Sequence, residues 1–479
     1  MTVLALAGGA AVATSLLSGG GSQPAAVLPA DAFAYLRLDI DPAAGQKVAA
    51  VRFLGAVPEV KDALTGDDPR RALWKAIVAD TDDACVTTLS YDADIAPWLG
   101  ERAGIAVRPG GTATEPNVAL ALQVTDEDRA RTTLTRLLSC SGSGHPDLRM
   151  RDGYAIVTTR GQGDATLAAV DAGALADDPT FSGDMTALGE QGVASMWVDA
   201  GPALSEGRGL DLTGLLGESL ASSPLTSPSP AGVQGRVAAA LRFDPSYVEL
   251  AGITRGFTAA APGPGDGTQL ARLPADTMAA LHVSGADAVV DSAWPELERQ
   301  IQDLAAGTGV DDPIAALEEE LDLSFPDDLV ALLGHSLTLS LPGQDIGADQ
   351  PVVGVTIVSS DAARADTVIS RVEDTAGATG LLTHRLDGDH LYVATSPDYA
   401  ADLLAGGHLG DGDAFRAAMG DVSRSSFGLY LDLDRLEPLY LDDTQGGART
   451  ALRAMRALGV NVGVTGAGEA AFSVRLVAD

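Results

Sequence analysis

The feature that most constrains the fold of this 479-residue chain is a pattern that occurs twice in the same order. The segment Leu28–Ala34 (Leu-Pro-Ala-Asp-Ala-Phe-Ala) recurs as Leu273–Ala279 (Leu-Pro-Ala-Asp-Thr-Met-Ala). Further matches follow at a nearly constant spacing: Trp98-Leu99-Gly100 with Leu332-Leu333-Gly334, Asp126 with Asp361, Asp152-Gly153 with Asp387-Gly388, Phe181 with Phe415, and Trp197-Val198-Asp199 with Tyr430-Leu431-Asp432. Self-similarity over this length indicates an internal duplication and predicts two homologous modules.

The repeat divides the chain into four segments. We expect residues 1–27 to form a signal or anchor segment with a Gly/Ser spacer, and residues 28–257 to form the first module. Residues 258–271 contain a run of alanine, proline and glycine and are predicted to be a flexible linker before the second module, residues 272–479.

Each half alternates short apolar runs with turn residues, and its helical patterns occur in clusters. In the first half, Asp126 precedes a helical pattern and is expected to cap it, with acidic residues in the first turn. Strands joined by short turns, with clustered helices, are typical of the α+β class. We therefore predict two tandem α+β modules, each a mainly antiparallel sheet backed by helices.

The charge balance limits the classes of partner. The chain has 31 Lys+Arg and 66 Asp+Glu, a formal net charge of −35 at pH 7. Nucleic-acid binding depends on cations that neutralise phosphates, so we expect no nucleic-acid partner. The same charge disfavours docking on anionic lipid, which leaves the N-terminal segment as the only expected contact with a membrane. Self-repulsion favours a monomer.

The N-terminal segment and the two cysteines point to export. Val3–Leu17 is apolar apart from Thr14 and Ser15, which suits the core of a signal peptide and is short for a membrane-spanning helix of about 20 residues. It is either a signal or anchor segment or the outer part of a longer anchor. In an exported chain, Cys85 and Cys140 are expected to form a disulfide, and two buried thiols are the alternative.

Patterns that carry chemistry are weak. The best metal candidates are His384, Asp387, Asp389 and His390, but the first half has no histidine at the matching turn, and the shared Asp-Gly is what a tight turn needs. Four Asp-x-Asp pairs resemble parts of calcium loops without the closing Glu: Asp39/Asp41, Asp92/Asp94, Asp411/Asp413 and Asp432/Asp434. For Asp39 and Asp432, helix capping is the favoured interpretation. We expect no cofactor and no catalytic residues.

Two arginine pairs are the best polar candidates for an equivalent role in each half. Arg129 corresponds to Arg364, and Arg136 to Arg371, on the helices that follow Asp126 and Asp361. Within each helix the two arginines, Arg129 with Arg136 and Arg364 with Arg371, are seven residues apart and therefore lie on one helix face. The structural alternative is that they stabilise their helices and the charges around them.

The opening of the first module resembles a known family. Leu28–Tyr35, Asp39-Ile40-Asp41-Pro42 and Arg52-Phe53-Leu54 are similar to the start of a family of uncharacterised actinobacterial proteins of unknown function. The resemblance implies a membrane anchor followed by an extracytoplasmic region, and it implies no activity and no site residues.

These observations favour a non-enzymatic protein, tethered to the membrane or secreted, that binds an envelope component or a protein partner. The first alternative is a carrier that holds an apolar ligand such as a lipid in a cavity of the α+β modules. The second is a hydrolase of unrecognised type, which would need a cleft with convergent titratable groups.

Overall fold

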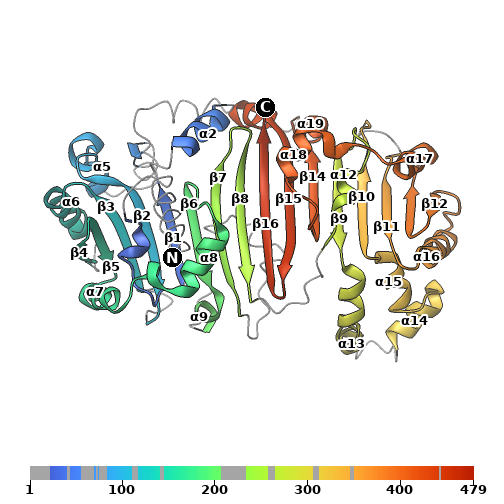
Figure 1. The fold of residues 1–479 in the computed structure, drawn as a ribbon, viewed down its shortest axis with the longest axis horizontal. Helices are drawn as coiled ribbons and strands as arrows, with labels where there is room; N and C mark the ends of the chain where they lie inside the picture. The colour runs from blue at the N-terminus through green and yellow to red at the C-terminus, as the bar shows by residue number, and fades with distance from the viewer. Residues whose placement is uncertain are drawn as a thin grey trace, which may run out of the picture. The chain divides into compact units, whose positions relative to one another are not determined.

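A computed structural model describes residues 22–39, 44–55, 70–71, 74, 84–110, 117–140, 145–205, 234–256, 265–305, 312–345, 350–441 and 444–479. It divides into two compact units, Met1–Phe257 and Thr258–Asp479, each of the α+β class (Figure 1). The apolar segment Val3–Leu17 lies outside the described residues. Within them, no helix combines the length and the apolar character needed to cross a membrane.

Unit 1 is built on an antiparallel sheet with the strand order β8-β7-β6-β1-β2-β3-β5-β4. The strands are β1 (Ala34–Asp39), β2 (Leu99–Arg108), β3 (Asn117–Val124), β4 (Asp147–Arg151), β5 (Tyr154–Thr158), β6 (Ala194–Asp199), β7 (Arg236–Phe243) and β8 (Tyr247–Arg255). The neighbours β2–β3, β4–β5 and β7–β8 are consecutive in the sequence and are joined by short connections, which antiparallel pairing allows.

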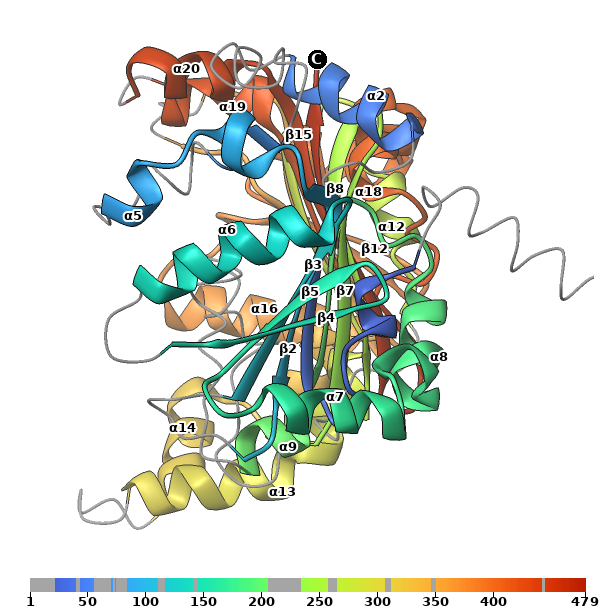
Figure 2. The ribbon, with the colours of Figure 1, turned by 90° about the vertical axis from the view of Figure 1, so that its left-hand side faces the viewer.

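Helices cover both faces of the unit 1 sheet. They are η1 (Pro24–Ala26), α2 (Ala44–Leu54), α5 (Ala84–Thr87), η2 (Tyr91–Ile95), α6 (Glu127–Cys140), α7 (Gly163–Ala172), η3 (Leu175–Asp177), α8 (Pro179–Leu188) and α9 (Ala200–Ser205). One core packs η1, η3 and α8 against β1, β2, β3 and β6, and a second packs α6 and η2 against β3 and β5. Figure 2 shows α6 and α8 on opposite sides of the sheet.

Unit 2 has an antiparallel sheet with the order β12-β13-β11-β10-β9-β14-β15-β16. Its strands are β9 (Ala279–Ser284), β10 (Ser336–Leu341), β11 (Gly354–Val358), β12 (Thr383–Asp387), β13 (His390–Ala394), β14 (Phe427–Asp432), β15 (Met455–Gly466) and β16 (Glu469–Ala478). Its helices are α12 (Thr268–Ala271), α13 (Ala286–Ala305), α14 (Pro313–Leu321), α15 (Asp327–Leu333), α16 (Ala362–Thr375), α17 (Pro397–Ala405), η4 (Leu409–Asp411), α18 (Asp413–Met419), α19 (Leu433–Tyr440) and α20 (Gly446–Arg453).

The two units follow the same path through their sheets. Reading from β8 in unit 1 and from β16 in unit 2, each strand has a counterpart at the same place in the order. The sequence repeats fall on counterparts too: Leu28–Ala34 leads into β1, and Leu273–Ala279 leads into β9. Asp126 and Asp361 each accept a hydrogen bond from the backbone N–H three residues later, at 3.1 Å and 3.0 Å, and so cap α6 and α16 as predicted.

The segments before β1 and β9 differ from the prediction. Residues 22–27 were assigned to the spacer, yet Ala25 and Val27 are buried in the core of unit 1. Residues 265–271 were assigned to a flexible linker, yet they contain α12, and Leu270 is fully buried. Both segments are short, so their few apolar side chains did not distinguish a packed segment from a spacer. Each unit thus starts with a short helix that lies over the sheet just before its first strand.

Candidate functional site

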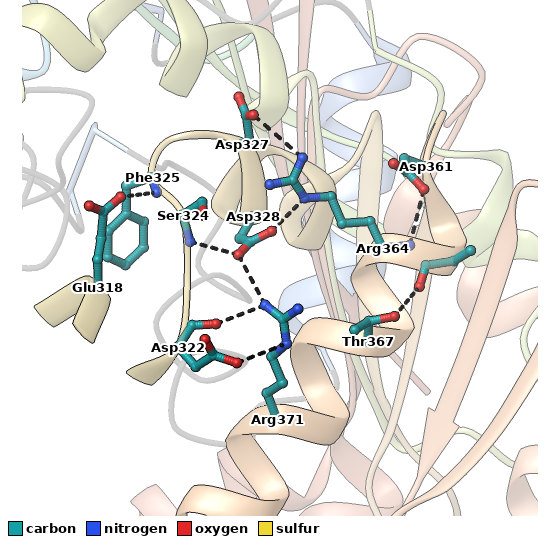
Figure 3. A network of polar contacts seen from close by, with 11 residues as sticks. Glu318, Asp322, Ser324, Phe325, Asp327, Asp328, Asp361, Arg364, Thr367 and Arg371 are labelled. Atoms are coloured by element: carbon teal, nitrogen blue, oxygen red, sulfur yellow. Dashed lines mark hydrogen bonds and ion pairs between the residues drawn. The ribbon is translucent and has the colours of Figure 1, made fainter. Parts of the chain in front are cut away.

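The two arginines singled out in the second repeat lie together at a pocket of unit 2. Arg364 and Arg371 both project from α16, toward the loop that joins α14 to α15 (Figure 3). Between their guanidinium groups lies the carboxylate of Asp328, in the first turn of α15, whose side chain is only 4% exposed. The i,i+7 spacing along α16 therefore places both cations against one buried anion.

Asp328 is held by two hydrogen bonds and a longer ion pair. Its Oδ1 accepts a hydrogen bond from Arg364 Nε at 2.5 Å, and its Oδ2 accepts one from the backbone N–H of Ser324 at 2.7 Å. Arg371 Nη1 lies 3.9 Å from Oδ2. Burial raises the pKa of Asp328, but these hydrogen bonds and the two positive charges outweigh it, so the pKa lies below its usual value. The carboxylate is therefore charged at neutral pH.

The pocket beside this carboxylate has a volume of about 400 Å³. It is lined by Ser324, Asp328, Ala363, Arg364, Thr367, Val368 and Arg371. Two exposed carboxylates reach the arginines from its edge. Asp327 Oδ2 lies 3.4 Å from Arg364 Nη1, and Asp322 Oδ2 lies 3.5 Å from Arg371 Nε. The lining is polar on one side, and Val368 with Ala363 supplies the apolar part.

Unit 1 contains a related arrangement. Asp94, in η2, accepts hydrogen bonds from the backbone N–H of Ser90 at 2.8 Å and from Arg136 Nη2 at 3.0 Å. The hydrogen bond from Ser90 is the largest cause of its lowered pKa, followed by the one from Arg136. Arg129 instead pairs with Asp126, the cap of its own helix, at 3.3 Å. Asp94 therefore has one arginine partner among the described residues where Asp328 has two, and its side chain is 29% exposed.

Sequence reasoning identified the arginines and missed the carboxylate that joins them. The signal was present: Leu89-Ser90-Tyr91 and Leu323-Ser324-Phe325 both precede an aspartate by the same spacing, Asp94 and Asp328. This match lies just before the repeated Leu-Gly at Gly100 and Gly334. A Ser-x-x-x-Asp pair of this kind closes a local turn, because the carboxylate can accept the serine N–H.

The weak metal candidates do not converge. Asp387 faces His390 across the β12–β13 hairpin, whereas His384 faces Val393, so the two histidines lie on opposite faces of the sheet. His384 Nδ1 lies 2.6 Å from Asp366 Oδ1 on α16, and His390 Nδ1 lies 2.7 Å from Asp389 Oδ1. In the part of the chain that the structure describes, no cluster of three or more such ligands is found.

The Asp-x-Asp pairs also resolve into other contacts. Asp432 accepts the backbone N–H of Arg435 at 3.2 Å and caps α19, as predicted. Asp39 instead lies buried at the end of β1, and its Oδ2 lies 2.5 Å from Arg37 Nη2 and 3.2 Å from Arg102 Nε; the N–H groups that it would cap lie outside the described residues. The reason is strand alternation, because Arg37 and Asp39 share a face of β1 and Arg102 is the partner of Asp39 across β2.

The other pairs are surface contacts or fall partly outside the described residues. Asp92 accepts hydrogen bonds from Arg71, and Asp413 accepts one from Arg416 at 2.6 Å. Asp411 lies 3.7 Å from the ring of His408. Asp41 and the side chains of Cys85 and Cys140 lie outside the described residues, so the disulfide stays a prediction. The backbones of α5 and α6, which carry the two cysteines, lie against each other.

The first strand of each unit carries a buried polar cluster under the preceding short helix. In unit 1, Arg37 Nε donates to Gln23 Oε1 at 2.8 Å, and Tyr154 OH donates to the Ser22 carbonyl at 2.6 Å. Burial lowers the pKa of Arg37, and the charge of Asp39 opposes this effect. The segment that precedes η1 is thus bound directly to the Arg37–Asp39–Arg102 cluster.

The counterpart in unit 2 is neutral. His282 Nδ1 lies 2.8 Å from Thr338 Oγ1, and His282 Nε2 lies 3.0 Å from Ser284 Oγ. Ser284 Oγ in turn donates to the Ser425 carbonyl at 3.0 Å, which assigns the imidazole proton to Nε2. Burial lowers the pKa of His282 to about 4, so the ring is neutral at neutral pH.

The sheet face on the other side from the preceding short helix is apolar in each unit and only partly covered. In unit 1, Leu36, Ile105 and Leu120 lie side by side on β1, β2 and β3, and Ile105 is 37% exposed. In unit 2, Leu281 pairs with Leu339 and Leu429, and Leu339 is also 37% exposed. Leu339 in β10 is the counterpart of Ile105 in β2.

In comparisons with known proteins, part of the chain matches a family of unknown function. Residues 1–182 match the family model described as "Protein of unknown function (DUF3352)". No curated protein matches the chain. Among solved structures, crystal form III of TP0453 matches with 10% sequence identity and a TM-score of 0.25, covering 50% of this chain and 82% of that one. A TM-score of this size supports no transfer of fold or function. The family match agrees with the expected resemblance at its coarsest level.

Proposed function

We propose that this chain is a non-enzymatic binding protein that faces the extracytoplasmic side, where residues 1–21 tether it or direct its export. It binds an envelope component or a protein partner through the pocket between α16 and the α14–α15 loop of unit 2. The observation that carries this proposal is the pocket itself, in which two arginines from one helix face line a space of about 400 Å³ beside a buried carboxylate.

The arginines keep donors available for a ligand. Arg364 uses Nε on Asp328 and Nη1 on Asp327, and Arg371 uses Nη1 on the Asp322 carbonyl at 2.8 Å. Neither Nη2 group makes a hydrogen bond to any residue that the structure describes. A guanidinium presents five N–H donors in a planar fork, so the unused edges suit a planar or charged acceptor. The fixed carboxylate of Asp328 orients these edges before any ligand arrives.

The test is a crosslinking experiment. The chain is crosslinked to its neighbours in intact cells of its source, it is then purified, and the partners captured with it are measured. We expect Arg371→Gln to reduce the yield of a specific partner severalfold, because its side chain lines the pocket and its loss leaves Asp328 bound to Arg364 and Ser324. The matched control is Arg136→Gln at the counterpart in unit 1, which should leave the yield unchanged. Equal yields from all three chains would contradict the proposal.

A second candidate function is a carrier of an apolar ligand. It is favoured by the partly exposed apolar residues on one sheet face of each unit. Leu339 of unit 2 and Ile105 of unit 1 stand at corresponding positions in apolar rows. Native mass spectrometry of the chain purified gently from its source tests this candidate. An adduct in stoichiometric amount that is extracted by organic solvent and is lost in Leu339→Glu would support the carrier, and a bare mass would oppose it.

A further inference from the structure

We infer that the pocket of unit 2 binds a small zwitterion of the size of a dipeptide, with its carboxylate on Arg364 and Arg371 and its ammonium group on Asp322. This inference rests on the function proposed above and names the class of ligand for the same site. The argument depends on the charges around the pocket, on how loosely the outer carboxylates are held, and on the size of the space.

The charges around the pocket do not suit a simple anion or a simple cation. Two arginines face three aspartates, Asp322, Asp327 and Asp328, so the immediate surroundings carry a net charge of 2 − 3 = −1. The whole chain adds a formal charge of −35, which repels a free anion. A free cation would meet two guanidinium groups. A ligand that carries both charges satisfies both sets of groups.

The inner and outer carboxylates play different roles. Asp328 is buried and its two oxygens are already bound by Arg364 and the Ser324 N–H, so it orients the arginines. Asp327 and Asp322 are 70% and 88% exposed and lie 3.4 Å and 3.5 Å from the guanidinium nitrogens, beyond normal charge-assisted hydrogen-bond length. Such exposed pairs contribute little, so these two carboxylates can turn toward an ammonium group at small cost.

The position of Asp322 is defined by the backbone. Asp322 ends α14 in the left-handed conformation, with φ of 53°, and its carbonyl accepts a hydrogen bond from Arg371 Nη1 at 2.8 Å. Its carboxylate is therefore kept near the Arg371 end of the pocket without depending on the ion pair. Figure 3 shows Asp322 next to Arg371 and Asp327 next to Arg364, so each arginine has one movable carboxylate beside it.

The volume sets the size of the ligand. A space of about 400 Å³ lies in the range of small-molecule sites, roughly 300–1,000 Å³. A dipeptide fits such a space, and its terminal charges are separated by one peptide unit. Exposed Ala363 provides a small apolar surface for a short side chain, and Val368 is buried behind it.

The experiment uses the full chain and three probes that share one dipeptide backbone and differ in which terminal charge they carry. The probes are alanyl-alanine, its N-acetyl derivative, which retains only the carboxylate, and its C-terminal amide, which retains only the ammonium group. Isothermal titration calorimetry at low salt measures each dissociation constant. We expect the dipeptide to bind and each single-charge derivative to bind about tenfold more weakly, the loss that one charge-assisted interaction gives.

Variants then connect each charge to its residues. Asp322→Asn, where asparagine tolerates the left-handed backbone, should weaken the dipeptide and leave the N-acetyl derivative unchanged. Arg371→Gln should weaken the dipeptide and leave the amide unchanged. Arg136→Gln in unit 1 is the matched control and should change none of the three constants.

Three results would overturn the inference. Binding of the N-acetyl derivative or of inorganic phosphate as tightly as the dipeptide would make this an anion site. Equal effects of Arg136→Gln and Arg371→Gln would place the binding elsewhere. If no probe binds, the zwitterion is rejected as the ligand. If capture from cells still depends on Arg371 in that case, the proposed binding function stays in place.

Discussion

The first strands of the two units occupy the same place in the same strand order, yet they bury different polar groups. In β1, Arg37 and Asp39 form a charged cluster with Arg102. In β9, the corresponding positions hold His282 and Ser284, which form a neutral chain of hydrogen bonds with Thr338. Most groups of both sets are hydrogen-bonded within their unit, while Asp39 Oδ1 is buried without a partner among the described residues, and both sets lie under the short helix that precedes the strand. The position therefore requires bonded polar groups and does not require charge.

A second contrast concerns how a helix is attached to the sheet. In unit 1, Asp184 of α8 accepts hydrogen bonds from Trp197 Nε1 at 2.9 Å and from Arg236 Nε at 2.7 Å. In unit 2, α18 approaches β15 so closely that a Cβ at Gly459 would lie 2.2 Å from the Ala418 carbonyl oxygen. Unit 1 again uses charge where unit 2 uses close packing, which predicts that the two units respond differently to mutation, reduction and pH.

The largest difference is expected when the charged cluster is broken. Asp39→Ala leaves Arg37 and Arg102 buried without this carboxylate and should lower the free energy of unfolding of unit 1 by about 3–5 kcal/mol. Ser284→Ala at the counterpart removes a hydroxyl that bonds His282, the Ser425 carbonyl and the Asp266 N–H, all without charge, and should cost unit 2 about 1–3 kcal/mol. Hydrogen exchange resolved by peptide in increasing urea separates the units, and equal losses would contradict the contrast.

Reduction should affect unit 1 alone, because both cysteines lie in it. A disulfide between Cys85 and Cys140 would close a loop of about 55 residues and stabilise unit 1 by about 4 kcal/mol on the chain-entropy estimate. The contact between α5 and α6 is consistent with this pairing. Peptide mapping without reductant identifies the bond, and Cys85→Ala/Cys140→Ala reproduces the effect of reduction. Two alkylatable thiols in the native chain would disprove it.

Acid should weaken unit 2 through His282. Burial lowers the pKa of His282 to about 4, below about 6.5 in an unfolded chain, so the unfolded state binds the proton more readily. The stability that the neutral ring contributes is complete above pH 6.5 and is lost as the pH falls toward 4, by up to about 1.4 kcal/mol per pH unit. His282→Gln should flatten this part of the pH profile. A profile that is unchanged by the substitution would remove His282 as its cause.

The smallest expected difference separates the two Ser-x-x-x-Asp turns. Asp328→Asn removes the buried charge between two arginines, which keep only their exposed partners Asp327 and Asp322 among the described residues, and should cost unit 2 about 1.5–3 kcal/mol. Asp94→Asn acts on a carboxylate that is 29% exposed and has one arginine partner, and should cost unit 1 at most about 1 kcal/mol. Urea unfolding followed by hydrogen exchange measures both, and the reverse order would show that the bridge in unit 2 is not cooperative.

Local patterns were sufficient for the general architecture. Strand alternation, the Asp126 and Asp361 caps and the Asp-Gly turns depend on residues a few positions apart, and the structure confirms the α+β class with antiparallel sheets. Local sequence also explains why His384 and His390 do not come together. Asp387 and His390 pair across the turn. Because side chains alternate along a strand, His384 then lies on the other face of the sheet, and the spacing within the hairpin already implied this separation.

The sequence alone determined the repeated order of elements and the two arginines on one face of α16, because each follows from periodicity along the chain. The tertiary structure decided which polar groups are buried and which meet. Asp39 could be read as a cap until Arg102 was found opposite it on β2, 63 residues away. Asp328 and Arg364 are 36 residues apart and meet only because α15 packs on α16. Contacts of this kind depend on how elements pack, which local periodicity does not encode.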